Sequence, residues 1–319
     1  MLINKKILFF LILTLLFFIV FNMFKNKNNK VYYYNLENKL VCEKIEAEGF
    51  LNFLYFNKLG NLMRPIFIIN FISKLMGAYQ DSFISKYKIK SFIKKYNINT
   101  SEFLKNISEF SSFNDFFVRE LSSGARLIDQ NKNNIISPAD SKFFIIPDIS
   151  QDVAFFVKNK KFNLEKFLND KVLAQKYQNG SLLIFRLAPP DYHRYHFSCD
   201  SIPEAPVKIN GILESVNSLV YKSGVQPLTE NERVLIKLNT QNFGDILFIP
   251  VGAMFVGKII NTFIPEKQYI KGQEMGYFKF GGSTIVMLFE KDKIKIQNKF
   301  LENSQNGFET QVKMGQILN

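Results

Sequence analysis

Cysteine, histidine and tryptophan are scarce in this chain, and their scarcity limits the kinds of disulfide, metal and imidazole chemistry that it can support. The 319 residues include two cysteines, two histidines and no tryptophan. Cys42 and Cys199 lie far apart in unrelated contexts, which argues against a disulfide framework and favours a reducing compartment. A zinc site is disfavoured, because His193 and His196 are the only histidines and the two cysteines are badly placed to complete a ligand set with them. Any imidazole chemistry must therefore occur around these two histidines.

Acidic residues are outnumbered. Forty-one lysines and arginines face 28 aspartates and glutamates, which gives a formal net charge of +13. The excess is spread among lysine, asparagine, isoleucine and phenylalanine and forms no nucleic-acid-binding motif. We therefore expect no nucleic-acid partner and predict an anionic phospholipid membrane instead. The 47% hydrophobic content is enough for a sizeable core in one or two domains.

One long hydrophobic run lies near the amino terminus. Residues 7 to 24 carry no charge, and a helix of this length is at the lower end of what spans a bilayer. A secretory signal is the rival interpretation, but no small-residue cleavage site follows the run. We predict an uncleaved anchor and a cell-membrane location. Lysines on both sides leave the orientation undecided, and we expect the catalytic core on the cytoplasmic side.

The rest of the chain divides into a helical part and a β-rich part. Residues 61 to 121 are predicted mainly as helices, and Asn99 with Glu102 indicates the start of one of them. From about residue 134 onward, short apolar runs between turn residues predict strands at Phe143–Ile146, Leu182–Leu187, Val234–Leu238, Ile246–Val251 and Ile285–Phe289.

These patterns predict an α+β fold, in which a helical N-terminal region packs on a β-rich, mostly antiparallel catalytic core. We divide the chain into a membrane anchor (1–30), a helical membrane-associating region (31–130) and the core (131–319). The helical region includes a basic amphipathic stretch, with Phe83, Ile84 and Tyr87 among five lysines. Such a stretch lies either in the headgroup region of a membrane or on an ordinary solvated surface, and the sequence supports both equally.

The most informative tetrapeptide is Gly281-Gly282-Ser283-Thr284. Two glycines leave the Gly282 carbonyl unshielded and allow strained backbone conformations, so that the Ser283 hydroxyl can reach that carbonyl. The resulting N-to-O acyl shift gives an ester. Elimination and hydrolysis then turn the serine into a pyruvoyl group, a carbonyl made without a bound cofactor. The alternative is a Gly-Gly turn before a buried strand.

A serine nucleophile needs a base, and both histidines lie in one polar cluster. Aspartate, tyrosine and arginine are interleaved with His193 and His196, and such a cluster is costly to bury for packing alone. Asp140 offers the carboxylate that fixes the tautomer of a histidine base, although a turn aspartate is the commoner interpretation. Spacing alone does not bring Asp140, a histidine and Ser283 together.

Four motifs in order make the chain resemble the pyruvoyl-dependent phosphatidylserine decarboxylase family. They are Phe113 to Leu121 followed by Gly124-Ala125-Arg126, Ser137 to Asp140, Arg186 to His196, and Lys271 to Thr284. Their ordered co-occurrence is far more specific than any one motif. The resemblance covers roughly residues 60 to 315.

The resemblance implies a proenzyme that cleaves itself between Gly282 and Ser283 into two chains that stay associated. Ser283 would become the covalent pyruvoyl cofactor. Asp140 and His196 would activate Ser283 for cleavage, as orienting carboxylate and base, and His193 would assist decarboxylation. The amine of phosphatidylserine would form a Schiff base with the pyruvoyl carbonyl, which takes up the electrons released with carbon dioxide and yields phosphatidylethanolamine. No metal is implied, and homo-oligomers are left open.

Departures from the family pattern and rival functions remain. Ser141 stands where the family usually has glycine, and if that backbone has a positive φ, serine costs about 1 kcal/mol and tilts Asp140. One rival is a serine hydrolase, although no G-x-S-x-G motif surrounds any serine. The others are a non-catalytic, membrane-anchored lipid-binding relative and a pyruvoyl-dependent decarboxylase of a free amino acid.

Overall fold

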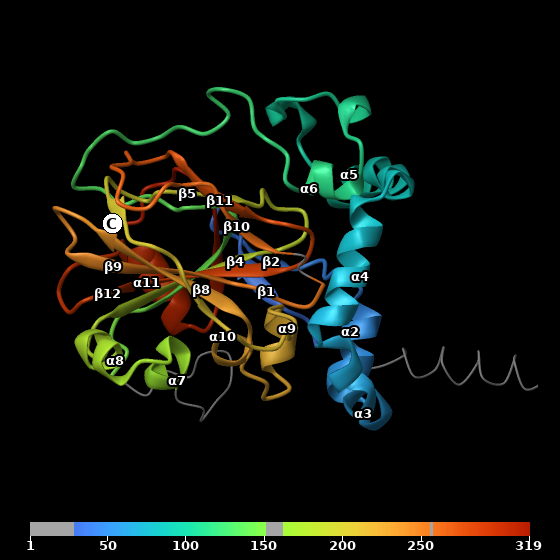
Figure 1. Ribbon diagram of the computed structural model, residues 1–319, viewed down its shortest axis with the longest axis horizontal. Coiled ribbons are helices and arrows are strands. Elements are labelled where there is room, and N and C mark those ends of the chain that lie inside the picture. The colour runs from blue at the N-terminus through green and yellow to red at the C-terminus, as the bar shows by residue number, and fades with distance from the viewer. Residues whose placement is uncertain (1–28, 151–161, 256–257) are drawn as a thin grey trace, which may run out of the picture.

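The computed structural model describes residues 29–150, 162–255 and 258–319 (Figure 1). The predicted anchor at residues 7 to 24 lies outside the described residues. The described chain forms a large sheet with helices at its sides, and a column of N-terminal helices stands at one end of the sheet (Figure 1). The predicted α+β class is therefore confirmed.

The large sheet holds the predicted core strands. Its order is β2-β1-β13-β3-β4-β12-β9-β8-β6, and β7 also pairs with β8. The bounds are β1 (Tyr32–Tyr34), β2 (Leu40–Cys42), β3 (Ser141–Ile146), β4 (Ser181–Leu187), β6 (Ile202–Pro203), β7 (Val207–Ile209), β8 (Arg233–Asn239), β9 (Asp245–Val251), β12 (Ser283–Phe289) and β13 (Glu309–Val312). The pairings between the named strands of this sheet in the described residues are antiparallel except that of β1 with β13. A smaller antiparallel sheet joins β10 (Ile259–Asn261), β11 (Glu274–Phe278) and β5 (Arg194–His196).

Strand β12 lies in the middle of the large sheet, and every one of its residues is buried. Its alternate residues face two different cores, because successive side chains of a strand point to opposite faces. Ile285 and Met287 pack in one core, and Val286 and Leu288 pack in the other. A strand covered on both faces needs a continuous apolar run, which explains the Ile-Val-Met-Leu-Phe sequence after the serine.

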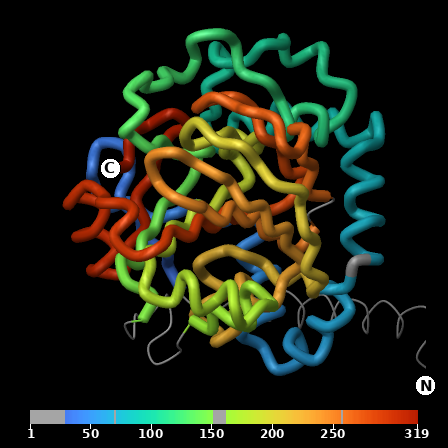
Figure 2. The backbone as a smooth tube through the Cα atoms, turned by 60° about the vertical axis from the view of Figure 1, so that its left-hand side comes forward, coloured from blue at the N-terminus to red at the C-terminus, as the bar shows by residue number. Residues whose placement is uncertain are grey.

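The N-terminal helices form a column beside the sheet in Figure 1, and Figure 2 shows the same column on the outer side of the core. Asn57 caps α3 (Lys58–Phe67) by accepting hydrogen bonds from two backbone N–H groups, and Asn97 ends α5 (Ile89–Tyr96) in the left-handed conformation. The column and the segment above it comprise α2 (Glu48–Phe56), α3 (Lys58–Phe67), α4 (Asn70–Asp81), the 3₁₀ helix η1 (Phe83–Lys88), α5 (Ile89–Tyr96) and α6 (Phe113–Phe117). Among the helices of the described ranges, none has both the length and the apolar character needed to cross a bilayer.

The remaining helices are short and flank the core. They are α7 (Leu164–Leu168), α8 (Lys171–Tyr177), α9 (Ser218–Tyr221), α10 (Pro227–Glu230) and α11 (Asn298–Gln305). Helix α11 contacts β3 and β13, so the segment after β12 returns to the same sheet.

The structure differs from the prediction at two places in the N-terminal part. The region predicted as helical also contributes β1 and β2 to the edge of the large sheet. Asn99 does cap the following residues, but they form the 3₁₀ turn η2 (Thr100–Glu102) rather than a long helix. A second 3₁₀ turn, η3 (Ile107–Glu109), follows with its own capping box from Asn106. Capping side chains so close together bond to the backbone locally and break the segment into separate turns.

Candidate functional site

The Gly-Gly-Ser segment crosses from the small sheet to the large one. Strand β11 ends at Phe278, and Ser283 is the fully buried first residue of β12. Gly281 has a φ of 141°, a backbone conformation that favours glycine. A Cβ atom added to Gly282 would lie 3.4 Å from a side-chain carbon of Val216, close to ordinary van der Waals contact. The local backbone therefore favours glycine at position 281, two residues before the serine.

His193 contacts the serine. Its Nδ1 lies 3.2 Å from Ser283 Oγ, and its Nε2 lies 3.0 Å from the backbone oxygen of Ala188. A carbonyl oxygen can only accept, so Nε2 carries the ring proton and Nδ1 is the free acceptor. The Ser283 hydroxyl therefore donates to His193, and this tautomer is ready to take the hydroxyl proton.

Burial keeps His193 neutral. Its ring stacks on Phe117 with centroids 3.8 Å apart, and the side chain is fully buried. Desolvation, and secondarily the positive charge of Arg119, lower the pKa of His193 to about 3. At neutral pH the imidazole is unprotonated, which is the state that a general base requires.

His196 is held by different groups. Its Nδ1 lies 2.9 Å from the backbone oxygen of Gly272, so Nδ1 donates and Nε2 accepts from the Tyr192 hydroxyl at 3.1 Å. Burial lowers its pKa, so it is neutral as well. Within the described residues, no hydrogen bond links His196 to Ser283.

Asp140 is a buried carboxylate surrounded by donors. Arg126 binds both carboxylate oxygens, with distances of 3.0 and 2.6 Å. Lys313 Nζ lies at 3.0 Å, and the backbone N–H of Met314 donates at 2.8 Å. Burial alone would raise the pKa of Asp140, but the hydrogen bonds from Arg126 and the charges of Lys313 and Arg126 hold it below the usual value. Asp140 therefore stays ionised and joins β3 to the segment after β13.

The structure thus brings Ser283 and His193 together, whereas the hydrogen bonds of Asp140 and His196 among the described residues go to other groups. The expected chain of hydrogen bonds from Asp140 through His196 to Ser283 is not seen among the described residues. The division of labour between the two histidines stays a prediction, and the contact geometry favours His193 as the partner of the serine.

Sequence reasoning did not single out several residues of this site. Tyr192 and Arg126 belong to motifs that were recognised, but no role was given to them. Lys313 gave no signal, because it reaches Asp140 only through the pairing of β13 with β3. Thr284 Oγ1 is buried and has no hydrogen-bond partner among the described residues, so a hydroxyl donor next to the serine is left free.

A small cavity borders the Gly-Gly segment. Its volume is about 110 Å³, and its lining is mainly apolar. Gly281 and Gly282 form one side, and Phe50 and Leu51 of α2 form another, together with Met254. Helix α2 therefore covers the approach to the peptide bond before Ser283.

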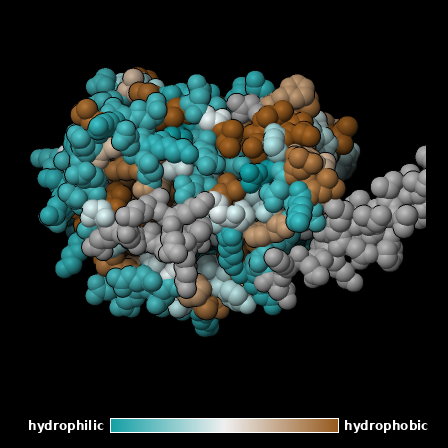
Figure 3. All heavy atoms as spheres, turned by 90° about the horizontal axis from the view of Figure 1, so that it is seen from below, coloured by the Kyte–Doolittle hydropathy of each residue, from teal (hydrophilic) through white to brown (hydrophobic). Residues whose placement is uncertain are grey.

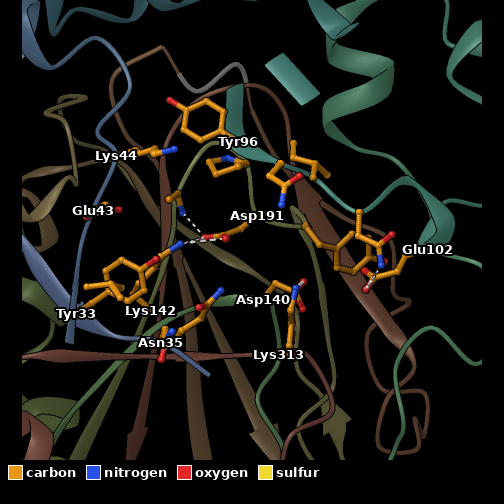
Figure 4. A pocket seen from close by; sticks show the side chains of 18 of the residues that line it. Tyr33, Asn35, Glu43, Lys44, Tyr96, Glu102, Asp140, Lys142, Asp191 and Lys313 are labelled. Atoms are coloured by element: carbon orange, nitrogen blue, oxygen red, sulfur yellow. Dashed lines mark hydrogen bonds and ion pairs between the residues drawn. The ribbon is translucent and has the colours of Figure 1, made fainter. Parts of the chain in front are cut away.

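A second cavity of about 530 Å³ borders the neighbouring turn and is polar. Figure 4 shows Lys142 and Asp191 pointing toward each other in it, with Asp140 beside Lys313. Lys142 Nζ lies 3.0 and 2.8 Å from the two Asp191 oxygens, and Asp191 also accepts from the backbone N–H of Ala188. These bonds fix the turn that carries the acceptor oxygen for His193.

Known proteins resemble this chain over most of its length. Residues 113–318 match the family described as phosphatidylserine decarboxylase. A phosphatidylserine decarboxylase proenzyme of Fusobacterium nucleatum is 44% identical over 279 residues, which cover 87% of this chain and 93% of the relative. Proteins with the same description from Clostridium tetani and Chlamydia pneumoniae are 44% and 41% identical, each over 89% of this chain and over 96% and 94% of their own lengths. The resemblance drawn from four motifs is confirmed, and so is the predicted enzyme class, a carboxy-lyase. The chain belongs to the phosphatidylserine decarboxylase family.

Proposed function

We propose that this chain is a proenzyme that cleaves itself between Gly282 and Ser283 and then decarboxylates phosphatidylserine to phosphatidylethanolamine. One observation carries the self-cleavage: the Ser283 hydroxyl donates to the bare Nδ1 of a buried, neutral histidine directly after two glycines. The names of the relatives support the substrate.

In the proposed cleavage, His193 Nδ1 accepts the hydroxyl proton while the Ser283 oxygen attacks the carbonyl carbon of Gly282. The peptide C–N bond breaks, and the proton passes to the departing amine, which leaves an ester. Loss of the Cα proton of residue 283 then expels the Gly282 carboxylate and gives dehydroalanine. Water replaces the nitrogen, ammonia leaves, and the pyruvoyl carbonyl remains at the start of the small chain.

The two products of this cleavage would stay together. The small chain, residues 283 to 319, contains β12, which pairs with both β4 and β9 in the middle of the sheet. It also contains β13, which pairs with β1 and β3. Separation would expose two apolar faces and break four strand pairings, so the cut removes only one covalent link.

The residues around position 283 suit a pyruvoyl group formed in place. When present, that group supplies a carbonyl that binds the substrate amine and takes up the electrons freed with carbon dioxide. The hydroxyl of Thr284, which has no hydrogen-bond partner among the residues that the structure describes, offers a donor next to it, and the Phe117 ring covers one face of His193. The mainly apolar cavity under α2 borders the same segment.

We also propose that the helical column docks on an anionic membrane. We call the following exposed side chains of α3, α4 and η1 the apolar face: Leu62, Ile66, Phe71, Leu75, Phe83, Ile84 and Tyr87. Figure 3 shows hydrophobic side chains gathered on the helical side of the molecule, at the right of the view. Lysines accompany the face, and Lys86 lies over the Phe83 ring. Apolar side chains with nearby cations are what an interfacial helix presents to headgroups. The cell-membrane location and the cytoplasmic side of the core stay proposals.

Glutamate substitutions on the apolar face should impair the enzyme only on vesicles. Replacing the exposed Leu62, Phe71 and Ile84 by glutamate removes apolar area that would be buried in the membrane and adds repulsion from anionic lipid. We therefore expect about tenfold lower activity on phosphatidylserine vesicles. Activity on a dispersed short-chain phosphatidylserine should change little. Val172→Glu, at an exposed valine of α8, is the matched control and should match the wild type in both assays. Equal losses on both substrates would refute the docking proposal.

A substrate comparison tests the proposed activity. Carbon dioxide release is measured from phosphatidylserine vesicles and from free serine with the same purified protein. We expect release from the lipid and little from serine, and Ser283→Ala should abolish it. Preference for the free amino acid would favour the alternative decarboxylase, and a lack of release by fully cleaved protein would favour a non-catalytic lipid-binding relative.

The self-cleavage rate should be nearly independent of pH from about pH 5 to 8. A base with a pKa of about 3 stays unprotonated over this range, and protons compete for Nδ1 only as the pH approaches that value. A histidine at the ordinary value of 6.5 would instead lose about tenfold in rate for each pH unit below it. The measurement follows cleavage of freshly synthesised chain in a series of buffers. A rate that already falls between pH 6.5 and 5.5 would contradict the assignment of a buried, neutral base.

A further inference from the structure

The side chain of Asn114 binds the backbone just before the Gly-Gly segment. Asn114 lies in α6 and is buried, with 3% of its surface exposed. Its Oδ1 accepts a hydrogen bond from the backbone N–H of Phe280 at 2.9 Å. Its Nδ2 donates to Asp81 Oδ1, at the end of α4, at 2.6 Å. An N–H can only donate and a carboxylate accepts, so the two partners fix the orientation of the amide.

Phe280 stands two residues before the peptide bond that the proposed function cleaves. Its ring lies between Phe113 and Phe117, with centroids 5.3 and 5.1 Å away, and Phe117 stacks on His193. Asn114 is thus in a helix whose aromatic residues already hold both Phe280 and the base. The Asn114 side chain binds the backbone of Phe280, while the neighbouring rings of α6 contact the Phe280 and His193 side chains.

The Gly-Gly segment needs such an anchor. Gly281 and Gly282 have no side chains to pack, and glycine has more backbone freedom than any other residue. On the carboxyl side, β12 fixes Ser283 by pairing it with Leu187. On the amino side, within the described residues, the Phe280 N–H is the backbone N–H nearest the two glycines that donates a hydrogen bond, and it donates to Asn114. The position of the Gly282 carbonyl relative to Ser283 Oγ is set between these two anchors.

We propose that Asn114, supported by Asp81, is a positioning residue for self-cleavage: it holds Phe280 so that the Gly282 carbonyl lies within reach of the Ser283 hydroxyl. The inference rests on the proposed cleavage at this bond. It gives a physical role to the Phe-Asn-Asp-Phe-Phe motif, which the chemistry of the serine and histidine leaves unexplained. A small misplacement of a reacting carbonyl is enough to slow an intramolecular attack severely.

An exchange of the two side chains tests this role. Asn114→Leu has a similar size and removes both hydrogen bonds, so we expect cleavage to slow by about tenfold or more. Asn114→Asp retains the acceptor for Phe280 but sets a carboxylate against Asp81, and it should also be slow. Adding Asp81→Asn to Asn114→Asp restores the hydrogen bond in the reverse direction, because the new amide at position 81 donates to the new carboxylate at position 114. Cleavage should then return to within about threefold of wild type. Asp81→Asn alone keeps an acceptor for Asn114 and should be nearly normal.

The readouts separate positioning from folding. Cleavage rates come from the small chain released by freshly synthesised full-length protein, and thermal unfolding of each substitution is measured in the uncut Ser283→Ala background. Slow cleavage by Asn114→Asp and its recovery in the exchanged pair support the proposal, whether or not Asn114→Leu folds. Wild-type rates for Asn114→Asp, or an exchanged pair no faster than Asn114→Asp, overturn it. Failure of the wild-type chain to cut at all would refute the proposed cleavage itself.

Discussion

Replacing His193 by glutamine should slow self-cleavage about a hundredfold to ten-thousandfold, the usual contribution of a positioned base. Glutamine can still receive a hydrogen bond from Ser283, but it cannot take the proton. The loss follows from the contact between His193 Nδ1 and Ser283 Oγ at 3.2 Å and from the tautomer that Ala188 imposes. The appearance of the small chain over time, in freshly synthesised protein, measures the effect.

His196→Gln is the matched control for that experiment. His196 bonds to Tyr192 and to the Gly272 backbone, so the substitution should slow cleavage much less than His193→Gln does. The family resemblance gave the two histidines the reverse roles, and the same pair of variants decides between them. Normal cleavage by His193→Gln together with none by His196→Gln would return the base to His196.

Arg186→Met should lower the free energy of unfolding by about 3–5 kcal/mol. Arg186 binds Glu43 through two nitrogens at 3.0 and 2.9 Å and Glu309 through two contacts at 2.8 and 2.5 Å. The side chains of both glutamates are at most 5% exposed. Removing the guanidinium would leave two carboxylates buried without their main partner, which costs far more than losing an exposed ion pair.

Urea unfolding of the uncut Ser283→Ala protein measures this effect. Lys39→Met is the control, because the Lys39–Glu37 pair is exposed and should contribute at most about 1 kcal/mol. A loss below about 1 kcal/mol for Arg186→Met would show that the two glutamates find other partners or take up protons. The Arg186 contacts bear on function because Arg186 belongs to β4, the strand that pairs with β12, and lies directly across from Thr284.

The core strands were predictable because each is a short apolar run between turn residues. The five predicted runs became β3, β4, β8, β9 and β12. Strands β1 and β2 were missed for a physical reason. Each has three residues and little apolar alternation, and their stability comes from pairing with each other and with β13, which is far away in the sequence. Sequence patterns report local burial, and these strands lie at the edge of the sheet.

The reacting residues were predictable from chemistry and scarcity, but their contacts were not. Two glycines before a serine and a single pair of histidines leave few choices for nucleophile and base. Which histidine reaches Ser283 depends on the turn that Asp191 and Lys142 hold, which is a tertiary feature. The partners of Asp140 depend on the pairing of β13 with β3 in the same way.

One expected cost does not arise in the structure. Ser141, where the family usually has glycine, begins β3 and is not among the described residues with a positive φ. Serine therefore fits this extended backbone without left-handed strain. Asp140 keeps its contacts with Arg126 and Lys313 next to it, so the departure from the family pattern gives no reason to expect a failure of maturation.

Intact masses of the purified chains test the central claim most directly. The wild-type protein and Ser283→Ala are expressed side by side, and both are weighed under denaturing conditions. We predict that the wild type yields a small chain of residues 283 to 319 whose amino terminus is blocked and carries a keto group, and that Ser283→Ala remains one chain. A single uncut chain in the wild type would contradict the account.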